Sequence, residues 1–149
     1  MTHKRASRAI IVNLQREVYL VVHNYVNPRN AGKWSTVGGR RDASDRDDLG
    51  CLRREIAEEF GADVLENCRI VSEIGSILKD QVRHIFFAVE FFGDTLKPLH
   101  TDEVLKGEFM ALEAAEELGR VGKLFFGTEY SMAAKAIQEL SELPPSSPF

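Results

Sequence analysis

The sequence predicts an α/β (α+β) fold in which helices flank both faces of a mixed β-sheet. Three observations support this prediction: β-rich runs recur along the chain, the first two runs are joined by a short turn, and segments with a helical period lie among and after them. Strands that alternate loosely with helices, with hairpins among them, are typical of a mixed sheet between helical layers. A chain of 149 residues suits one core, so we expect a single domain over residues 1–143.

The first elements are expected to form a hairpin. Residues 9–14 (AIIVNL) and 18–22 (VYLVV) are rich in β-branched side chains, and three polar residues separate the two runs. Asn, Pro and Gly are frequent over residues 24–33, which predicts a surface loop. A short strand is then expected over 34–37, directly before a pair of glycines.

Residues 47–60 have a helical period. Their apolar side chains lie three or four positions apart and form one stripe: Leu49, Leu52, Ile56 and Phe60. Three residues are candidates for the N-cap: Ser44, Asp45 and Asp47. Gly61 is well placed to end the helix, whereas Gly50 costs about 1 kcal/mol relative to Ala and predicts a loose first turn.

The second half of the chain is expected to complete the sheet and to end in helices. Residues 82–92 (VRHIFFAVEFF) are apolar on both faces in the middle of the run, as in a central strand. The other elements follow from composition and period: strands over 64–78 and 107–111, a loop over 93–105, helices over 112–118 and 129–140, and a disordered tail over 144–149 (PPSSPF).

Composition and charge exclude several classes of function. No apolar run approaches the roughly 18 residues of a membrane span, so no membrane partner is expected. The apolar run after the basic N-terminus is short and soon becomes polar, which favours a strand over a signal peptide and makes the cytoplasm the expected location. A net charge of −4 without a basic patch disfavours duplex nucleic acid. Cys51 and Cys68 are expected to be buried free thiols.

Three glutamates on the predicted helix are the first candidates for chemistry. Glu55, Glu58 and Glu59 are spaced i, i+3 and i+4, so their side chains meet on one face beside the apolar stripe. Like charges so close repel one another, and a divalent cation with a preference for oxygen ligands, Mg²⁺ or Mn²⁺, would relieve the repulsion. An acidic helix face is more often solvated surface with pairs such as Arg54–Glu58, so the spacing alone does not identify a metal site.

The segment before the helix changes this balance. The pair Gly38-Gly39 follows a predicted strand, where backbone without side chains can approach a ligand and its N–H groups can bind phosphate oxygens. A loop with both signs of charge follows, with Arg40, Arg41, Asp42 and Asp45. A glycine pair, a charged loop, an acidic helix and a closing glycine in this order are much rarer than each part alone.

This ordered set resembles the Nudix box, G-x5-E-x7-R-E-U-x-E-E-x-G-U, in which U is a bulky aliphatic residue. Residues 54–62 (REIAEEFGA) match its second half almost fully, and Gly39 matches its opening glycine. By this resemblance the chain is identified as a MutT-like member of the Nudix hydrolase family. The resemblance implies an α/β/α sandwich with a mixed sheet.

The chain departs from the Nudix pattern in the loop half of the box. Gly39 and Arg54 are separated by one residue more than in the pattern, so the loop carries an insertion. The first glutamate of the pattern is absent, and Asp45 is the best-placed substitute. Ala62 replaces the final bulky residue, and Val37 replaces the usual proline before the glycines. These departures concern loop geometry and substrate positioning and leave all three metal-binding glutamates in place.

The resemblance implies roles for the residues of the box. Glu55, Glu58 and Glu59, together with Gly39, would bind Mg²⁺, with Mn²⁺ able to substitute and Glu59 as the central ligand. Arg54 would orient Glu55 or Glu58 through a charge-assisted hydrogen bond. A metal-activated water would attack one phosphorus of a diphosphate. The general base would be Glu55 or, as the alternative, Glu103 in the later loop 100–105, whose plainer interpretation is a solvated acid.

Substrate contacts are predicted less directly. Cationic and glycine residues around the start of the box could hold phosphates: Lys33, Gly38, Gly39, Arg40 and Arg41. Trp34 and Tyr25 could stack on a nucleobase, although an aromatic residue beside a strand is more often part of the core. His84, on a strand predicted to be central, is expected to be structural.

The expected substrate is a small nucleoside diphosphate linked to another moiety, of the nucleoside triphosphate or nucleotide-sugar type. Residues 72–80 (SEIGSILKD) lack the proline typical of ADP-ribose enzymes and the tyrosine typical of dinucleoside polyphosphate enzymes, which argues weakly against both. Two alternatives stay open: a non-catalytic nucleotide sensor, which would have lost box glutamates, and a diphosphate isomerase of the same fold, which would need an active-site cysteine. The sequence is compatible with a homodimer.

Overall fold

A computed structural model describes residues 4–143 of the chain, so the predicted disordered tail over 144–149 lies outside the described residues. The elements are, in order, β1 (Lys4–Val12), β2 (Val18–His23), the 3-10 turn η1 (Pro28–Asn30), β3 (Trp34–Ser35), β4 (Val37–Arg40), α1 (Asp48–Phe60), α2 (Ala62–Glu66), β5 (Cys68–Lys79), β6 (Val82–Phe91), β7 (Val104–Met110), α3 (Leu112–Arg120) and α4 (Glu129–Glu142).

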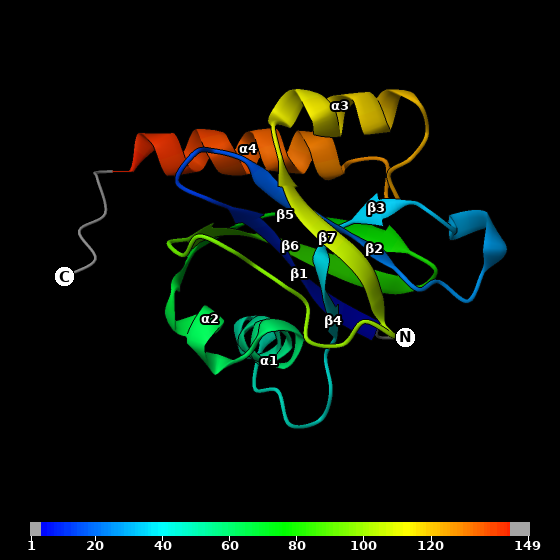
Figure 1. Cartoon of the computed structure of the whole chain (residues 1–149). Coiled ribbons are helices and arrows are strands. Elements are labelled where there is room, and N and C mark those ends of the chain that lie inside the picture. The colour runs from blue at the N-terminus through cyan, green and yellow to red at the C-terminus, as the bar shows by residue number, and fades with distance from the viewer. Residues whose placement is uncertain (1–3, 144–149) are drawn as a thin grey trace.

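The seven strands form one mixed sheet between two helical layers (Figure 1). Helices α1 and α2 cover one face, and α3 and α4 cover the other (Figure 1). β6 lies between β1, to which it is parallel, and β5, to which it is antiparallel, so the prediction of a central strand is confirmed. The predicted fold class is confirmed as well.

Alternating side chains of β1 supply both layers of the core. Ala9 and Ile11 join the cluster under α1, whereas Ile10 and Val12 join the cluster under α4. This period of two is the geometry of any strand with both faces buried. Because Arg8 has the same parity as Ile10, it belongs to the α4 face of the sheet.

The sheet opens beside β1, and this opening positions the candidate site. The first half of β1 pairs with β4 over Ala6–Ala9, whereas only its last two residues pair with β2. β3 pairs with β2, whereas β4 pairs with β1. The chain therefore crosses from one of these strands to the other at Thr36, between β3 and β4. Because β2 pairs with β1 at only two residues, the space between the rest of these two strands can take side chains from both faces of the sheet.

Several predicted boundaries were wrong. β1 begins at Lys4 and not at residue 9, because parallel pairing with distant β6 extends it. The glycine pair lies inside β4 and not after a strand. Residues 64–66 are helical in α2, where Val64 and Leu65 pack against the cluster under α1. β7 begins at Val104, inside the predicted loop.

Helix α1 has the predicted extent, with two differences in detail. Asp47 is the N-cap among the three candidates, because its carboxylate accepts the N–H of Gly50 at 2.7 Å. That bond ties the first turn of the helix at the position of the glycine. Leu49 was wrongly placed in the buried stripe, since it is 38% exposed, while Cys51 is buried instead. Cys68 is only partly buried, and both thiols are free.

Residues 4–143 contain no helix that is both long and apolar enough to cross a membrane.

Candidate active site

The three glutamates of α1 lie at graded depths. The whole Glu59 residue is only 7% exposed, and the side chains of Glu55 and Glu58 are 14% and 56% exposed. All three line one pocket of about 180 Å³ together with His100 and Glu103. We call it the acidic pocket. The structure therefore brings Glu103, which is far away in sequence, to the same place as the glutamates of the helix.

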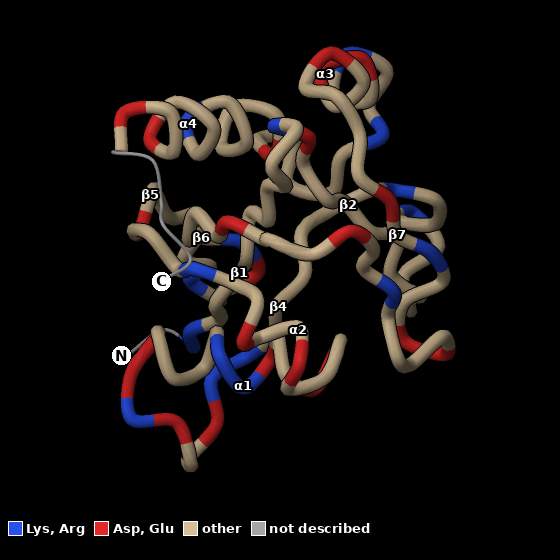
Figure 2. Tube along the Cα trace, turned by 60° about the vertical axis from the view of Figure 1, so that its left-hand side comes forward, with Lys and Arg blue, Asp and Glu red and all other residues tan. Residues whose placement is uncertain are grey.

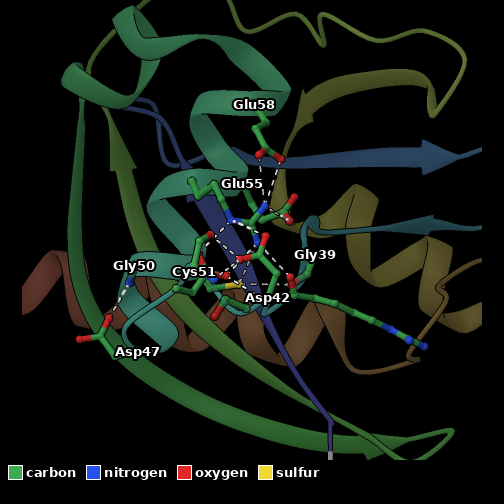
Figure 3. A network of polar contacts seen from close by, with 12 residues as sticks. Gly39, Asp42, Asp47, Gly50, Cys51, Glu55 and Glu58 are labelled. Carbon is green, nitrogen blue, oxygen red and sulfur yellow. Dashed lines mark hydrogen bonds and ion pairs between the residues drawn. The ribbon is translucent and has the colours of Figure 1, made fainter.

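Arg54 connects the loop before α1 with two of these carboxylates, Glu55 and Glu58. Figure 3 shows these two glutamates in the polar network beside Gly39 and Asp42. The Nε and Nη2 atoms of Arg54 donate to the two carboxylate oxygens of Asp45, each at 2.9 Å. Its Nη1 atom donates to Glu55 and to Glu58, each at 3.1 Å. A bidentate pair of this kind fixes both distance and orientation, so Asp45 holds the guanidinium in the place from which it reaches the glutamates.

The loop between β4 and α1 carries charges of both signs. Basic and acidic residues are interspersed along it (Figure 2). The hydrogen bonds from Arg54 keep the pKa of Asp45 far below its usual range, and Asp45 in turn raises the pKa of Arg54. Asp45 thus takes part in the network at the position where the Nudix pattern has its first glutamate, despite the inserted residue.

The two glycines of β4 are required for different reasons. A Cβ atom on Gly39 would lie 2.5 Å from the carboxyl carbon of Glu55, so the missing side chain makes the room in which this carboxylate sits. Gly38 has a φ of +145°, and a Cβ there would overlap the carbonyl oxygen of Ser7. Gly39 therefore serves the site, and Gly38 serves the pairing of β4 with β1.

Gly39→Ala and Gly38→Ala are expected to separate these two requirements. Gly39→Ala should displace Glu55 and lower turnover about tenfold or more, with a smaller effect on stability because its obstacle is the end of a side chain. Gly38→Ala should destabilise the protein by about 1–3 kcal/mol or more, because its obstacle is backbone and its φ is unfavourable for alanine. Urea unfolding and turnover, measured on both variants, check the pair. Equal losses of stability would contradict the distinction.

The acidic pocket has the features that a divalent cation requires. The Oε2 atom of Glu59 is buried and has no hydrogen-bond partner among residues 4–143. Burial first, and then the charges of Glu55 and Glu103, raise the pKa of Glu59 to about 7. A buried carboxylate that lacks a partner is costly, and a bound cation would remove this cost.

The carboxylates do not form a finished coordination shell. Within the described part of the chain, no three Asp, Glu, His or Cys side chains converge closely enough to hold a metal ion. Arg54 holds Glu55 and Glu58 in ion pairs. Hard oxygen ligands fit Mg²⁺, so these residues suit the metal once their side chains rotate toward it.

A second pocket, of about 360 Å³, adjoins the acidic one and shares Glu103 with it. We call it the central pocket. Gly38 lies on its wall, as do Tyr25 and Phe125, whose rings stack with their centroids 4.9 Å apart. Its volume and its aromatic and polar lining are those of a site for part of a small molecule.

Not all predicted substrate residues reach these pockets. Lys33 and Trp34 line neither of them. The Trp34 side chain packs against the hydrophobic cluster under α4, and the Nζ atom of Lys106 lies 4.9 Å from the centre of its ring. Arg41 lines neither pocket and instead donates to the carbonyl of Arg46 at 2.7 Å and pairs with Asp48 at 3.6 Å. Arg40 lines a third, neighbouring pocket.

Three residues that line the pockets of the site were not predicted from the sequence: Arg8, His100 and Phe125. For Arg8 a signal exists. Arg8, Ile10 and Val12 alternate along one strand, so a strand extended by one residue would have predicted an inward-facing cation. His100 and Phe125 lie in loops, where no period indicates which way a side chain points.

His84 is buried, as the structural interpretation requires. Its Nδ1 atom accepts a hydrogen bond from the Nε of Arg8 at 3.3 Å. Burial, followed by the charges of Arg8, Arg40 and Lys79, lowers the pKa of His84 to about 4. The imidazole is therefore neutral near pH 7, with Nδ1 as an acceptor.

This shift predicts a pH-dependent stability. The folded-state pKa of about 4 lies below the ordinary value of 6.5, so the stabilisation is complete above pH 6.5 and is lost as the pH falls toward 4. His84 should contribute about 2 kcal/mol to the loss of unfolding free energy between pH 7 and pH 5. His84→Asn, which keeps an acceptor and does not titrate, should lose that much less than the wild type. An equal loss in both proteins would contradict the assignment.

Comparisons with known proteins agree with the fold. The family model of the Nudix domain matches residues 2–125. An ADP-ribose pyrophosphatase from Streptococcus suis is 20% identical, with 98% of this chain and 97% of that one covered and a TM-score of 0.65. An Ap4A hydrolase from C. elegans is 16% identical, with 93% and 99% covered and a TM-score of 0.71.

A MutT protein from Methanosarcina mazei Go1 is 18% identical, with 95% of this chain and 97% of that one covered and a TM-score of 0.64. At these identities the solved structures show a shared fold. The domain match, which covers most of the chain and includes the whole box, shows the family. The chain belongs to the Nudix hydrolase family.

Proposed function

We propose that the chain is a Mg²⁺-dependent hydrolase that cleaves the diphosphate linkage of a nucleoside diphosphate joined to another moiety. The observation that carries this proposal is the buried Glu59 carboxylate, which has one unpartnered oxygen in a pocket that Glu55, Glu58 and Glu103 also line. The central pocket, joined to this one at Glu103, offers room for the rest of the substrate.

Glu59, Glu55 and Glu58 would hold the cation, and the carbonyl of Gly39 beside Glu55 would add a ligand. When bound, Mg²⁺ neutralises diphosphate charge and makes a water molecule more acidic. Arg54 does not touch the substrate in this proposal. It orients Glu55 and Glu58, and Asp45 orients Arg54.

Glu103 is the better candidate for the general base. Of the carboxylates described in the structure, it is the one that lines both the acidic and the central pocket. Its carboxylate could accept the proton of an attacking water where the two pockets meet. Glu55, by contrast, is held by Arg54 and packed against Gly39, an arrangement that suits a metal ligand better than a mobile proton acceptor.

The isomerase alternative fits the thiols poorly. Cys51 is fully buried and donates toward the carbonyl of Gly39 at 3.5 Å. Burial raises its pKa and raises that of Cys68 to about 11. Neither cysteine lines the acidic or the central pocket. A thiol that is protonated and covered is a weak nucleophile or acid.

A hydrolysis screen tests the proposal. Nucleoside triphosphates, ADP-ribose, nucleotide sugars and dinucleoside polyphosphates are incubated with the protein in Mg²⁺ or EDTA, and the products are separated chromatographically. We expect cleavage of at least one of them with Mg²⁺ only, and a loss of turnover of about 10²-fold or more in Glu103→Gln. Thiol alkylation should leave the activity unchanged.

The opposite outcomes of the screen are also informative. If none of these compounds is cleaved while nucleotides still bind, the sensor alternative replaces the proposal. If Glu103→Gln turns over like the wild type, Glu55 becomes the proposed base. Mass measurement of the native protein in solution decides between monomer and homodimer.

A further inference from the structure

A third pocket, which we call the basic pocket, adjoins the central pocket at Arg8 and Phe125, whereas the acidic pocket adjoins it at Glu103. The basic pocket has a volume of about 180 Å³, and its charged and titratable lining residues are Arg8, Arg40, Lys79, Asp80 and His84. Three joined pockets therefore pass from negative to positive across the opening in the sheet.

Arg8 lies at the junction of the central and basic pockets with unused hydrogen-bond donors. Among residues 4–143 it forms no ion pair within 4.0 Å, and its hydrogen-bond partners are neutral: Nδ1 of His84 at 3.3 Å and the carbonyl of Thr36 at 3.5 Å. Burial lowers the pKa of this guanidinium. A guanidinium carries five N–H groups in a rigid fork suited to phosphate, and its Nη2 atom has no partner within the described chain.

Lys79 brings a second cation to the same pocket. Its Nζ atom donates to the carbonyl of Phe125 at 3.1 Å and lies 4.2 Å from the centre of that residue's ring. These contacts fix the ammonium group, and two of its three N–H groups stay available. The carbonyl and the ring of Phe125 thus hold Lys79 at the pocket without neutralising it.

The charge of the pocket is positive even when its acid is counted. Arg8, Arg40 and Lys79 contribute three positive charges, exposed Asp80 contributes one negative charge, and His84 is neutral near pH 7. A small polar pocket with an excess of two positive charges attracts anions, and its donors match the oxygens of a phosphate group.

We infer that the basic pocket is an anion subsite that binds a phosphate group of the substrate remote from the linkage that is cut. This inference rests on the proposed function for the placement of the scissile diphosphate at the acidic pocket. It narrows the substrate class to nucleoside diphosphate derivatives that carry at least one further phosphate, either in a longer polyphosphate chain or as a monoester on the other end of the molecule.

The first test measures binding without metal. Inorganic pyrophosphate is titrated into the protein of residues 1–149 in EDTA, where the unneutralised acidic pocket repels anions. We expect saturable binding that Lys79→Gln weakens about tenfold and that Arg120→Gln, an exposed arginine paired with Glu117 on α3, leaves unchanged. Arg8→Lys, which keeps the charge and loses the fork, should weaken binding as well. Binding that is absent in the wild type, or equal in Lys79→Gln, would overturn the inference.

The second test uses substrate pairs that differ by phosphate groups. Coenzyme A is compared with dephospho-coenzyme A for the monoester, and diadenosine tetraphosphate with diadenosine diphosphate for the chain. The wild type should prefer the more phosphorylated member of one pair about tenfold in kcat/KM, and that pair identifies the source of the phosphate. In Lys79→Gln the ratio of the two kcat/KM values should fall toward one.

Hydrolysis without any preference in either pair would overturn the subsite and leave the hydrolase function intact. Loss of metal-free pyrophosphate binding in Lys79→Gln, without hydrolysis of any compound, would support the subsite and refute the hydrolase.

Discussion

Glu59→Gln is expected to lower Mg²⁺-dependent turnover at least about 10³-fold while the protein stays folded. Glu59 is the most buried of the three glutamates, and one of its oxygens has no hydrogen-bond partner within residues 4–143. A neutral amide of the same shape keeps the packing and removes the charge that would bind the cation. Loss of a central ligand removes several kcal/mol of charge stabilisation, which corresponds to about three powers of ten in rate.

The control for this variant is Glu66→Gln, which changes an exposed glutamate on α2. It alters the net charge equally and should leave kcat unchanged. Glu59→Gln should unfold at a urea concentration equal to or higher than that of the metal-free wild type, because burial disfavours the charged carboxylate there. Wild-type turnover in Glu59→Gln would show that this residue is not a ligand.

Arg54→Gln has the second largest expected effect, a 10- to 100-fold loss of Mg²⁺ affinity. The variant removes hydrogen bonds to Asp45, Glu55 and Glu58. It also leaves the three carboxylates close together without the guanidinium that lies between them. Because the loss is one of orientation, high Mg²⁺ concentrations should restore part of the activity. Activity measured against Mg²⁺ concentration gives the affinity.

Two further variants separate orientation from charge. Arg54→Lys keeps the positive charge and cannot form the bidentate pair with Asp45, so it should remain impaired. Arg53→Gln removes the exposed neighbouring arginine on the same helix and should bind Mg²⁺ like the wild type. If Arg54→Lys were fully active, charge alone would explain the role of Arg54.

The helical half of the site could be predicted from the sequence because its geometry is local. The spacing of Glu55, Glu58 and Glu59 fixes their common face as soon as the helix forms. The sequence also predicted that Asp45 takes the place of the absent glutamate, because few acidic residues lie in the loop between Gly39 and the helix. The direction of its contact was not predictable, because the inserted residue gives the loop several ways to close.

The strand half of the site depends on distant pairing, which a single sequence does not reveal. Arg8 faces the pockets because β6, more than seventy residues later, extends β1. Trp34 and Lys33 are adjacent in sequence to the glycine pair, yet the chain crosses from one edge of the sheet to another at Thr36. Nearness in sequence to the glycine pair therefore did not predict which residues line the pockets. Glu103, which is distant in sequence, lines two of them, whereas Lys33 and Trp34 line neither.

Binding of Mn²⁺, followed by electron paramagnetic resonance on metal-stripped protein, tests whether the glutamates of α1 hold a divalent cation. The wild type should bind Mn²⁺, Mg²⁺ should displace it, and Glu59→Gln should bind it at least about tenfold more weakly, whereas Glu66→Gln should match the wild type. Equal Mn²⁺ affinity in the wild type and Glu59→Gln would contradict the assignment of the acidic pocket as the metal site.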